Sequence, residues 1–245
     1  INGVTGSGKT EVYLQIVEEV LKDNKSAIIL VPEIGLTPQT VARFKGRFNE
    51  EVAIIHSKLT QKERYDQWMR IKNGDIRIVV GARSAIFSPV QNLGIIIIDE
   101  EHDNSYVSSH TPKYKTVDIA EYMVDINGAM LILGSATPCL DSYYKTSKDI
   151  YKLYEMKERA NGKSLPKIEV ADMALELNNG NTSIFSLKLY EAILDNLKNR
   201  KQTMLFLNRR GYSGFVSCRT CGEAIKCEDC DVSTVSYTHL RAHET

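Results

Sequence analysis

Apolar stretches rich in isoleucine and valine alternate with amphipathic stretches along the first 150 residues. Strands buried on both faces of a parallel sheet have this short, nearly continuous apolar character. Five such stretches occur, at 27–32, 52–57, 76–82, 93–100 and 129–136. Four segments between them have the spacing of amphipathic helices, at 11–23, 37–48, 60–74 and 116–128. Strand and helix therefore alternate, which predicts an α/β fold with a parallel sheet over residues 1–150.

The pattern becomes more polar after residue 150. Residues 151–166 end in the polar sequence KERANGKSLP and are predicted to form a linker. A second α/β unit is predicted over 167–212, with strands at 167–172 and 202–212 and a helix at 186–200. This unit has too few strands to close a core by itself.

Composition narrows the function only slightly. The 245 residues include 31 Lys and Arg and 31 Asp and Glu, so the net charge is zero. A neutral total neither supports nor excludes nucleic-acid binding, because a local basic surface can exist in a neutral chain. The chain has no apolar run of roughly 18 residues and no pattern of a secretory signal at its start, so we expect a cytoplasmic protein without a membrane span.

Residues Gly3 to Thr10 match the pattern of a phosphate-binding loop, Gly-x4-Gly-Lys-Thr. Glycines in such a loop let backbone N–H groups surround phosphate oxygens, and the following helix directs its positive end at the same anion. Lys9 is expected to reach the β- and γ-phosphates, and the hydroxyl of Thr10 is expected to bind Mg²⁺. The predicted nucleotide-binding residues are Gly3, Gly6, Ser7, Gly8, Lys9 and Thr10.

The apolar stretch at 93–100 ends in two carboxylates, Asp99 and Glu100. Such a pair at a strand end is often only a solvated cap, but here a phosphate loop lies upstream. We therefore expect Asp99 to hold Mg²⁺ together with Thr10, and Glu100 to orient or deprotonate the attacking water. The predicted catalytic residues are Lys9, Asp99 and Glu100, and the predicted reaction is hydrolysis of the γ-phosphate.

DEEH at 99–102 and GSAT at 134–137 resemble motifs of superfamily 2 helicases, and seven sequence blocks occur in the order found in the bacterial replication-restart helicases. They are GVTGSGKTEVYL, LVPEIGLTPQ, HSKLTQKER, GARSAIFSP, DEEHDNSY, GSATP and LNRRGY. In these blocks the chain resembles the bacterial replication-restart helicases from residue 3 to about residue 233. The resemblance implies a RecA-like P-loop NTPase sheet as helicase lobe 1 over 1–150, missing its first strand, and the start of lobe 2 over 167–212.

The resemblance also implies a function. Replication-restart helicases are ATP-dependent enzymes that move 3′ to 5′ on DNA and take part in primosome assembly. By this likeness the cofactors are ATP, Mg²⁺ and Zn²⁺. The implied partners are forked and single-stranded DNA, primosome proteins and the loader of the replicative helicase, and the enzyme is expected to be a monomer.

Further site residues follow from the same likeness. Three residues are implied to couple the state of the nucleotide to DNA: His102, Ser135 and Thr137. The blocks that touch DNA in such motors supply Pro32, Glu33, Gly35, Arg83 and Ser84, and the loop after DEEH supplies Tyr106 and Tyr114 as base-stacking residues. A surface salt bridge is the alternative role for Arg83, and an ordinary solvated loop is the alternative for residues 103–115.

Four cysteines lie within thirteen residues, at Cys218, Cys221, Cys227 and Cys230. In a reducing cytosol such a cluster favours metal binding over disulfides, and the two Cys-x2-Cys pairs can share one Zn²⁺. In the replication-restart helicases, however, four pairs bind two zinc ions, which would make residues 213–233 a partial zinc-binding region. The tail at 234–245 does not continue the family pattern and is expected to be non-native.

Two hypotheses from different classes remain. The first is a DNA motor, of which this chain is expected to be a truncated fragment. The resemblance implies that arginines of a complete second lobe assist hydrolysis, so we expect the fragment alone to hydrolyse little ATP. The second is a non-hydrolysing adaptor that binds zinc and DNA and keeps a vestigial nucleotide site. The intact Lys9, Thr10, Asp99 and Glu100 favour the motor.

Overall fold

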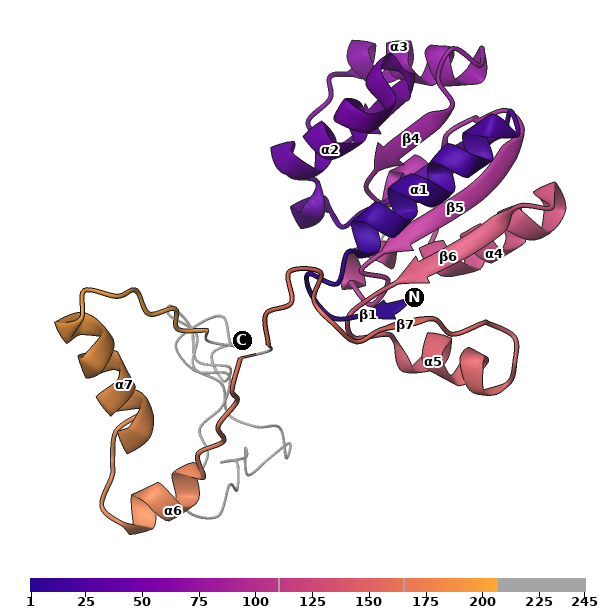
Figure 1. The fold of residues 1–245 in the computed structure, drawn as a ribbon. Helices are drawn as coiled ribbons and strands as arrows, with labels where there is room; N and C mark the ends of the chain where they lie inside the picture. The colour runs from indigo at the N-terminus through magenta and orange to yellow at the C-terminus, as the bar shows by residue number, and fades with distance from the viewer. Residues whose placement is uncertain (110, 165, 207–245) are drawn as a thin grey trace, which may run out of the picture. The chain divides into compact units, whose positions relative to one another are not determined.

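The computed structural model describes residues 1–109, 111–164 and 166–206 (Figure 1). Contacts between residues divide the chain into two units, Ile1–Leu165 and Pro166–Thr245. Within the described ranges, no helix is both long enough and apolar enough to cross a lipid bilayer.

A five-stranded parallel sheet in the order β3-β4-β2-β5-β6 forms the centre of the first unit (Figure 1). The strands are β2 (Ser26–Leu30), β3 (Val52–Ile55), β4 (Ile78–Gly81), β5 (Leu93–Asp99) and β6 (Met130–Gly134), which confirms the five predicted strands. Every neighbouring pair is parallel. The carboxyl ends of all five strands therefore lie at the same edge of the sheet, where polar residues follow them.

Helices cover both faces of this sheet. They are α1 (Lys9–Lys22), α2 (Pro38–Phe48), α3 (Gln61–Lys72) and α4 (Thr116–Asn127), which confirms the four predicted helices. Side chains of α1 and α2 pack with Ile29 and Ile97, whereas side chains of α3 and α4 pack with Ile28 and Ile96. Because successive strand residues point to opposite faces, the continuous isoleucine runs are buried on both sides of the sheet.

The sequence did not reveal two short strands and one helix of the first unit. β1 (Asn2–Gly3) pairs in parallel with β7 (Glu155–Met156), and α5 (Leu140–Ser147) follows β6. β1 also lies beside the end of β6, because Asn2 forms a β-bridge with Ser135. The phosphate loop thus follows a strand of two residues, and the segment predicted as a linker at 151–166 contains a strand paired within the first unit.

Short 3-10 helices follow three of the strands, at η1 (Glu33–Gly35), η3 (Arg83–Phe87) and η4 (Asn104–Tyr106), and η2 (Asn49–Glu51) connects α2 to β3. Three of these turns contain residues predicted to bind DNA. They follow β2, β4 and β5 respectively, so the fold gathers the predicted DNA residues at the carboxyl edge of the sheet.

The described part of the second unit contains two helices, α6 (Met173–Asn178) and α7 (Leu187–Lys198). α7 confirms the helix predicted at 186–200. The strand predicted at 167–172 is wrong, because these residues form no strand and the side chains of Ile168 and Val170 are 84% and 95% exposed. Apolar alternation produces a strand only where a neighbouring strand is available, and residues 166–206 contain none.

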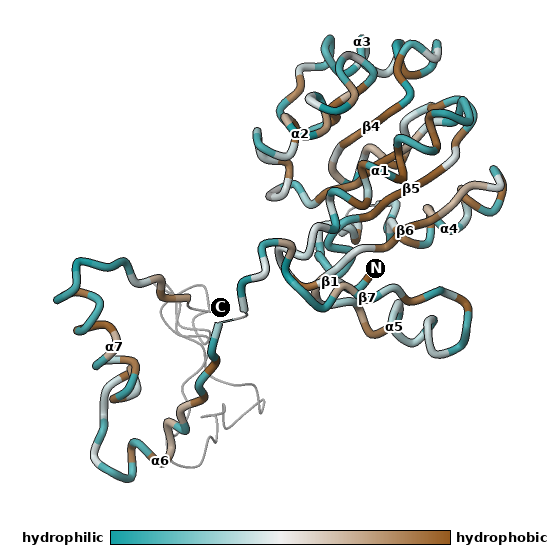
Figure 2. The backbone as a smooth tube through the Cα atoms, viewed as in Figure 1, coloured by the Kyte–Doolittle hydropathy of each residue, from teal (hydrophilic) through white to brown (hydrophobic). Residues whose placement is uncertain are grey.

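Hydropathy along the backbone differs between the two units. In Figure 2 the apolar residues are concentrated on β4, β5 and β6, whereas α7 alternates between apolar and polar positions. Residues 202–206 are described and form no strand. The remainder of the strand predicted at 202–212, the zinc-binding region at 213–233 with its four cysteines, and the tail at 234–245 lie outside the described residues.

Candidate functional site

The phosphate loop has the backbone that its glycines predict. Gly6 and Gly8 have φ angles of +80° and +94°, which side-chain-bearing residues adopt at a cost. Gly8 is the N-cap of α1, so the unpaired N–H groups of the first helical turn face the loop. A β-carbon at Gly3 would lie 2.7 Å from Oγ of Ser7, so this position also requires glycine.

Two side chains of the loop are buried without a charged partner. Nζ of Lys9 donates to the carbonyl oxygen of Gly3 at 2.7 Å. Oγ of Ser7 is buried and has no hydrogen-bond partner among the residues that the structure describes. A buried polar atom without a partner requires an explanation, and a bound anion supplies one. The residues present therefore fit a phosphate group.

Asp99 and Glu100 end β5 at the carboxyl edge of the sheet. Asp99 is half-buried, and burial raises the pKa of its carboxyl above the usual value, although a hydrogen bond from Tyr13 and the charge of Lys9 act in the opposite direction. Glu100 has a φ of +47°, a left-handed conformation that is unusual for a residue with a side chain. The backbone therefore turns sharply between the two carboxylates, and backbone strain of this kind often marks functional sites.

One cavity of about 650 Å³ brings the loop and the carboxylates together. Its lining includes Lys9, Thr10, Asp99 and Glu100, as well as the remaining loop residues from Thr5 to Gly8. An adjoining cavity of about 330 Å³ shares Thr10, Asp99 and Glu100 with it. The structure thus gathers the predicted catalytic residues around one space, although 89 positions separate Thr10 from Asp99 along the chain.

Arg43 lines both of these cavities and was missed by sequence reasoning. It lies on α2, directly before the buried Phe44, and its side chain is exposed. Its neighbour Arg47 also lines the larger cavity and forms a 2.7 Å ion pair with Glu18 of α1. The only sequence signal was a pair of arginines spaced four residues apart on an amphipathic helix, which is also typical of an ordinary solvated face.

The three predicted coupling residues are close together. Nδ1 of His102 lies 2.7 Å from Oγ of Ser135, and the backbone N–H of Thr137 donates to the same Oγ at 2.9 Å. Nδ1 of His102 also lies 3.7 Å from a carboxylate oxygen of Glu100. A continuous polar path therefore leads from Glu100 through His102 and Ser135 to the segment that follows β6.

Glu101 has a role that the sequence did not indicate. Its side chain is buried, and it accepts hydrogen bonds from the backbone N–H of Cys139 at 2.6 Å and from Oγ of Ser142 at 3.1 Å. These donors belong to the start of α5, so the carboxylate stabilises the positive end of that helix. Burial and the charge of Glu101 raise the pKa of the Cys139 thiol.

Two buried tyrosines hold Asp99. The hydroxyl of Tyr13, on α1, donates to Oδ1 of Asp99 at 2.9 Å, and the hydroxyl of Tyr106 donates to its backbone carbonyl at 2.8 Å. Burial, followed by the charge of Asp99, raises the pKa of both tyrosines, so both hydroxyls keep the proton that they donate. Tyr106 is only 3% exposed, which corrects the expectation that it stacks on DNA bases, because its ring is packed inside the protein.

A different set of side chains forms an aromatic surface, which consists of the exposed Phe87 and the half-buried Arg83 and Tyr114. The rings of Phe87 and Tyr114 are 5.4 Å apart in a T-shaped arrangement, and the guanidinium of Arg83 lies 5.7 Å from the centre of the Tyr114 ring. Nη1 of Arg83 donates to the carbonyl oxygen of Val107 at 2.6 Å, so this hydrogen bond goes to the backbone of the neighbouring loop and not to a carboxylate. Phe87 is 55% exposed and was not predicted.

The other predicted DNA residues have varied surroundings. Ser84, in η3, is exposed beside the aromatic surface. Pro32 is buried and, together with Gly35, lines the smaller cavity beside Asp99, whereas Glu33 is exposed. Pro32 and Gly35 therefore lie close to the nucleotide residues.

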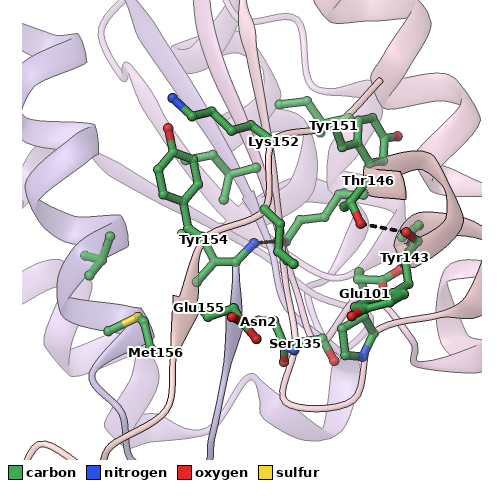
Figure 3. A pocket seen from close by; sticks show the side chains of 18 of the residues that line it. Asn2, Glu101, Ser135, Tyr143, Thr146, Tyr151, Lys152, Tyr154, Glu155 and Met156 are labelled. Carbon is green, nitrogen blue, oxygen red and sulfur yellow. Dashed lines mark hydrogen bonds between the residues drawn. The ribbon is translucent and has the colours of Figure 1, made fainter. Parts of the chain in front are cut away.

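A third cavity, which is largely apolar and measures about 750 Å³, lies beside β6 (Figure 3). Leu131 and Leu133 of β6 line it together with side chains of α5 and of residues 150–156. Glu101 and Ser135 reach it, but none of the predicted nucleotide-binding residues does. This space is therefore separate from the candidate nucleotide site.

The described residues contain no group of three His, Cys, Asp or Glu side chains placed to hold a metal ion. A Mg²⁺ ion does not need such a group in a nucleotide site, because phosphates and water complete its coordination. The hydroxyl of Thr10 and the carboxylate of Asp99, which line the same cavity, suit this arrangement.

Comparison with known proteins identifies the family. The model of the DEAD/DEAH box helicase family matches residues 1–145. The chain belongs to the DEAD/DEAH box helicase family. Among similar solved structures, the Pyrococcus furiosus Hef helicase domain superposes with a TM-score of 0.50 at 20% identity, covering 81% of this chain and 43% of that one. This likeness confirms the RecA-like α/β fold class.

Several relatives are more similar in sequence. The chain is 50% identical over 246 residues to the replication restart protein PriA of Bacillus subtilis (strain 168), covering 99% of this chain and 31% of the relative. The corresponding protein of Synechocystis sp. is 46% identical over 248 residues, covering 99% and 30%. The resemblance to replication-restart helicases is thus confirmed, and the chain spans about a third of the length of these relatives.

Proposed function

We propose that this chain provides the ATP-binding lobe of a DNA helicase that acts in replication restart. The observation that supports this most strongly is the single cavity that brings Lys9, Thr10, Asp99 and Glu100 together beside the unpaired hydroxyl of Ser7. The relatives of B. subtilis and Synechocystis sp. are replication restart proteins, and this supplies the biological context.

The nucleotide site works by positioning charge. In the proposed complex, backbone N–H groups of the loop and the ammonium of Lys9 hold the phosphates of ATP, and the buried Ser7 hydroxyl gains a partner. Thr10 and Asp99 would hold Mg²⁺, which when bound neutralises charge on the phosphates. Glu100 lies in the same cavity and orients the attacking water or accepts its proton.

The polar path through His102 provides the proposed coupling. The Ser135 hydroxyl is shared between His102 and the backbone N–H of Thr137. A change at Glu100 on hydrolysis alters the position of His102, which in turn changes the hydrogen bond available to the segment after β6. Coupling between the nucleotide and DNA sites requires such an element with two hydrogen-bonding arrangements.

DNA is proposed to bind at the aromatic surface and the neighbouring turns. Tyr114 and Phe87 offer rings to unstacked bases, and Arg83 and Ser84 offer donors to the phosphate backbone. The proposed substrates are forked and single-stranded DNA, with movement 3′ to 5′. Primosome proteins and the loader of the replicative helicase are the proposed partners of a cytoplasmic monomer.

The remaining proposals concern the second unit. Residues 167–212 are proposed to begin helicase lobe 2, and Cys218, Cys221, Cys227 and Cys230 are proposed to take part in binding Zn²⁺. Because arginines supplied by a second lobe commonly stabilise the transition state of phosphoryl transfer, we expect this chain to bind ATP and to hydrolyse it slowly when tested alone.

The test is ATP hydrolysis with and without single-stranded DNA. We would compare the 245-residue chain with a chimera that adds the sequence following the matched region in the B. subtilis relative, and include Lys9→Ala in both. The proposal predicts hydrolysis by the chimera that rises with DNA and disappears in Lys9→Ala. DNA binding without any Lys9-dependent hydrolysis would instead favour the adaptor hypothesis and contradict the motor.

A further inference from the structure

Tyr13 lies one helical turn after Thr10 on α1 and is 1% exposed. Its hydroxyl donates to Oδ1 of Asp99 at 2.9 Å, across 86 positions of the chain. Helix α1 therefore begins with Lys9, proposed to bind the phosphates, and Thr10, proposed to bind the cation. One turn later the same helix carries Tyr13, which holds the carboxylate of Asp99, the other proposed ligand of the cation.

The surroundings leave the Tyr13 hydroxyl little freedom. Its ring packs in the apolar layer between α1 and the sheet. A β-carbon added to Gly134, at the end of β6, would lie 1.7 Å from the hydroxyl oxygen. The absence of a side chain at Gly134 thus makes room for the hydroxyl. Packing therefore fixes the direction of the hydrogen bond to Asp99.

We propose that Tyr13 is a positioning residue, which fixes the carboxylate of Asp99 so that its second oxygen faces the cation of the bound nucleotide. This inference rests on the proposed function, because it assumes that Asp99 and Thr10 share a cation. In the proposed complex, Oδ1 keeps the hydrogen bond from Tyr13, and Oδ2 is the oxygen offered to the metal. Residues that orient metal ligands by hydrogen bonds typically contribute roughly 10- to 100-fold to metal affinity.

A purely structural role for the hydroxyl is the competing explanation, and Tyr106 supplies a matched control. Both tyrosines are buried and both hydroxyls donate to Asp99. Tyr106, however, donates to the backbone carbonyl, so it holds the main chain but does not touch the carboxylate. Loss of the Tyr106 hydroxyl removes a contact to the main chain of Asp99, whereas loss of the Tyr13 hydroxyl removes a contact to the carboxylate itself.

The experiment compares Tyr13→Phe and Tyr106→Phe in the full 245-residue chain. Binding of Mn²⁺ in the presence of ADP is followed by electron paramagnetic resonance, and binding of a fluorescent ADP analogue is measured in EDTA. We expect Tyr13→Phe to weaken Mn²⁺ binding roughly tenfold and Tyr106→Phe to change it less than about twofold. Affinity for the nucleotide without metal is expected to stay the same in both variants.

A double-mutant cycle keeps the inference testable if Tyr13→Phe also lowers stability. In an Asp99→Asn background the carboxylate is absent, so Tyr13→Phe is expected to have no further effect on Mn²⁺ affinity. Three results would overturn the inference while leaving the proposed function intact. They are equal losses of Mn²⁺ affinity in Tyr13→Phe and Tyr106→Phe, no loss of Mn²⁺ affinity in Tyr13→Phe, and additive losses in the double-mutant cycle. Failure of the unchanged chain to bind ADP with Mn²⁺ would overturn the proposed function as well.

Discussion

The nucleotide edge, formed by Lys9, Thr10, Asp99 and Glu100, differs in construction from the aromatic surface formed by Arg83, Phe87 and Tyr114. At the nucleotide edge, Lys9 is buried and Asp99 is held by hydrogen bonds from two buried tyrosines. At the aromatic surface, Phe87 is more than half exposed, and Arg83 and Tyr114 are half-buried. The side chains of the nucleotide edge are therefore held more firmly by the fold than the ring of Phe87.

This difference predicts how substitutions act. Changes at the nucleotide edge alter both the fold and the ligand affinity, because the same hydrogen bonds serve packing and binding. A change at Phe87 is expected to alter DNA affinity with little effect on stability, because its side chain is exposed and exposed side chains contribute little to stability. Each prediction below tests one side of this comparison.

The largest effect is expected from Lys9→Ala. Loss of a charged hydrogen-bond donor to phosphate costs about 1.5–3 kcal/mol, so nucleotide affinity should fall roughly 10- to 100-fold. Titration with a fluorescent ATP analogue measures the change. Lys22→Ala, on the exposed end of the same helix, serves as the control and should bind normally. Equal affinity of Lys9→Ala and Lys22→Ala for the ATP analogue would contradict the assignment of the loop to the nucleotide site.

Gly134→Ala tests how tightly the nucleotide edge is packed. Its new β-carbon would lie 1.7 Å from the oxygen and 2.8 Å from the adjoining ring carbon of Tyr13, so we expect a loss of about 1–3 kcal/mol in the free energy of unfolding, measured with urea. Gly46→Ala in α2 is the control, since nothing lies within 4 Å of its added carbon, and it should stabilise by up to about 1 kcal/mol. A neutral Gly134→Ala would contradict the tight packing.

Substitution of the two rings of the aromatic surface tests the other side of the comparison. We expect Phe87→Ala and Tyr114→Ala each to weaken single-stranded DNA binding about fivefold, near the lower limit of about 1 kcal/mol for base stacking. Fluorescence anisotropy measures the affinity, and the urea midpoint should not move in Phe87→Ala, because that side chain is exposed. Tyr122→Ala, which changes an exposed tyrosine on α4, is the control. Unchanged DNA binding in both variants, or a fall in the stability of Phe87→Ala equal to that of Gly134→Ala, would contradict the proposed aromatic surface.

The smallest effect concerns Cys139, whose thiol pKa is raised by burial and by the charge of Glu101. Because the thiolate is the reactive form, alkylation by iodoacetamide at neutral pH should be slower in the folded chain than in urea. The difference should narrow as the pH rises past the raised pKa. Peptide mass spectrometry follows this cysteine separately from the other four. Equal rates in the folded and unfolded chain would show that Glu101 does not act on the thiol.

The sequence determined the features that depend on short segments. Runs of isoleucine and valine specified strands buried on both faces, and the glycine spacing of residues 3–10 specified the phosphate loop. Asp99 and Glu100 were found because they directly follow such a run. The prediction of a strand at 167–172 was wrong, because a strand also needs a neighbouring strand and alternation of apolar residues alone cannot supply one.

Only the tertiary structure decided which distant residues share a site. Tyr13 meets Asp99 across 86 positions, and Glu101 meets Cys139 across 38, because the parallel order of the strands brings their carboxyl ends together. The burial of Tyr106 and the exposure of Phe87 follow from the same arrangement. A local pattern specifies an element and its chemistry, whereas the exposure and partners of a side chain depend on how the elements pack.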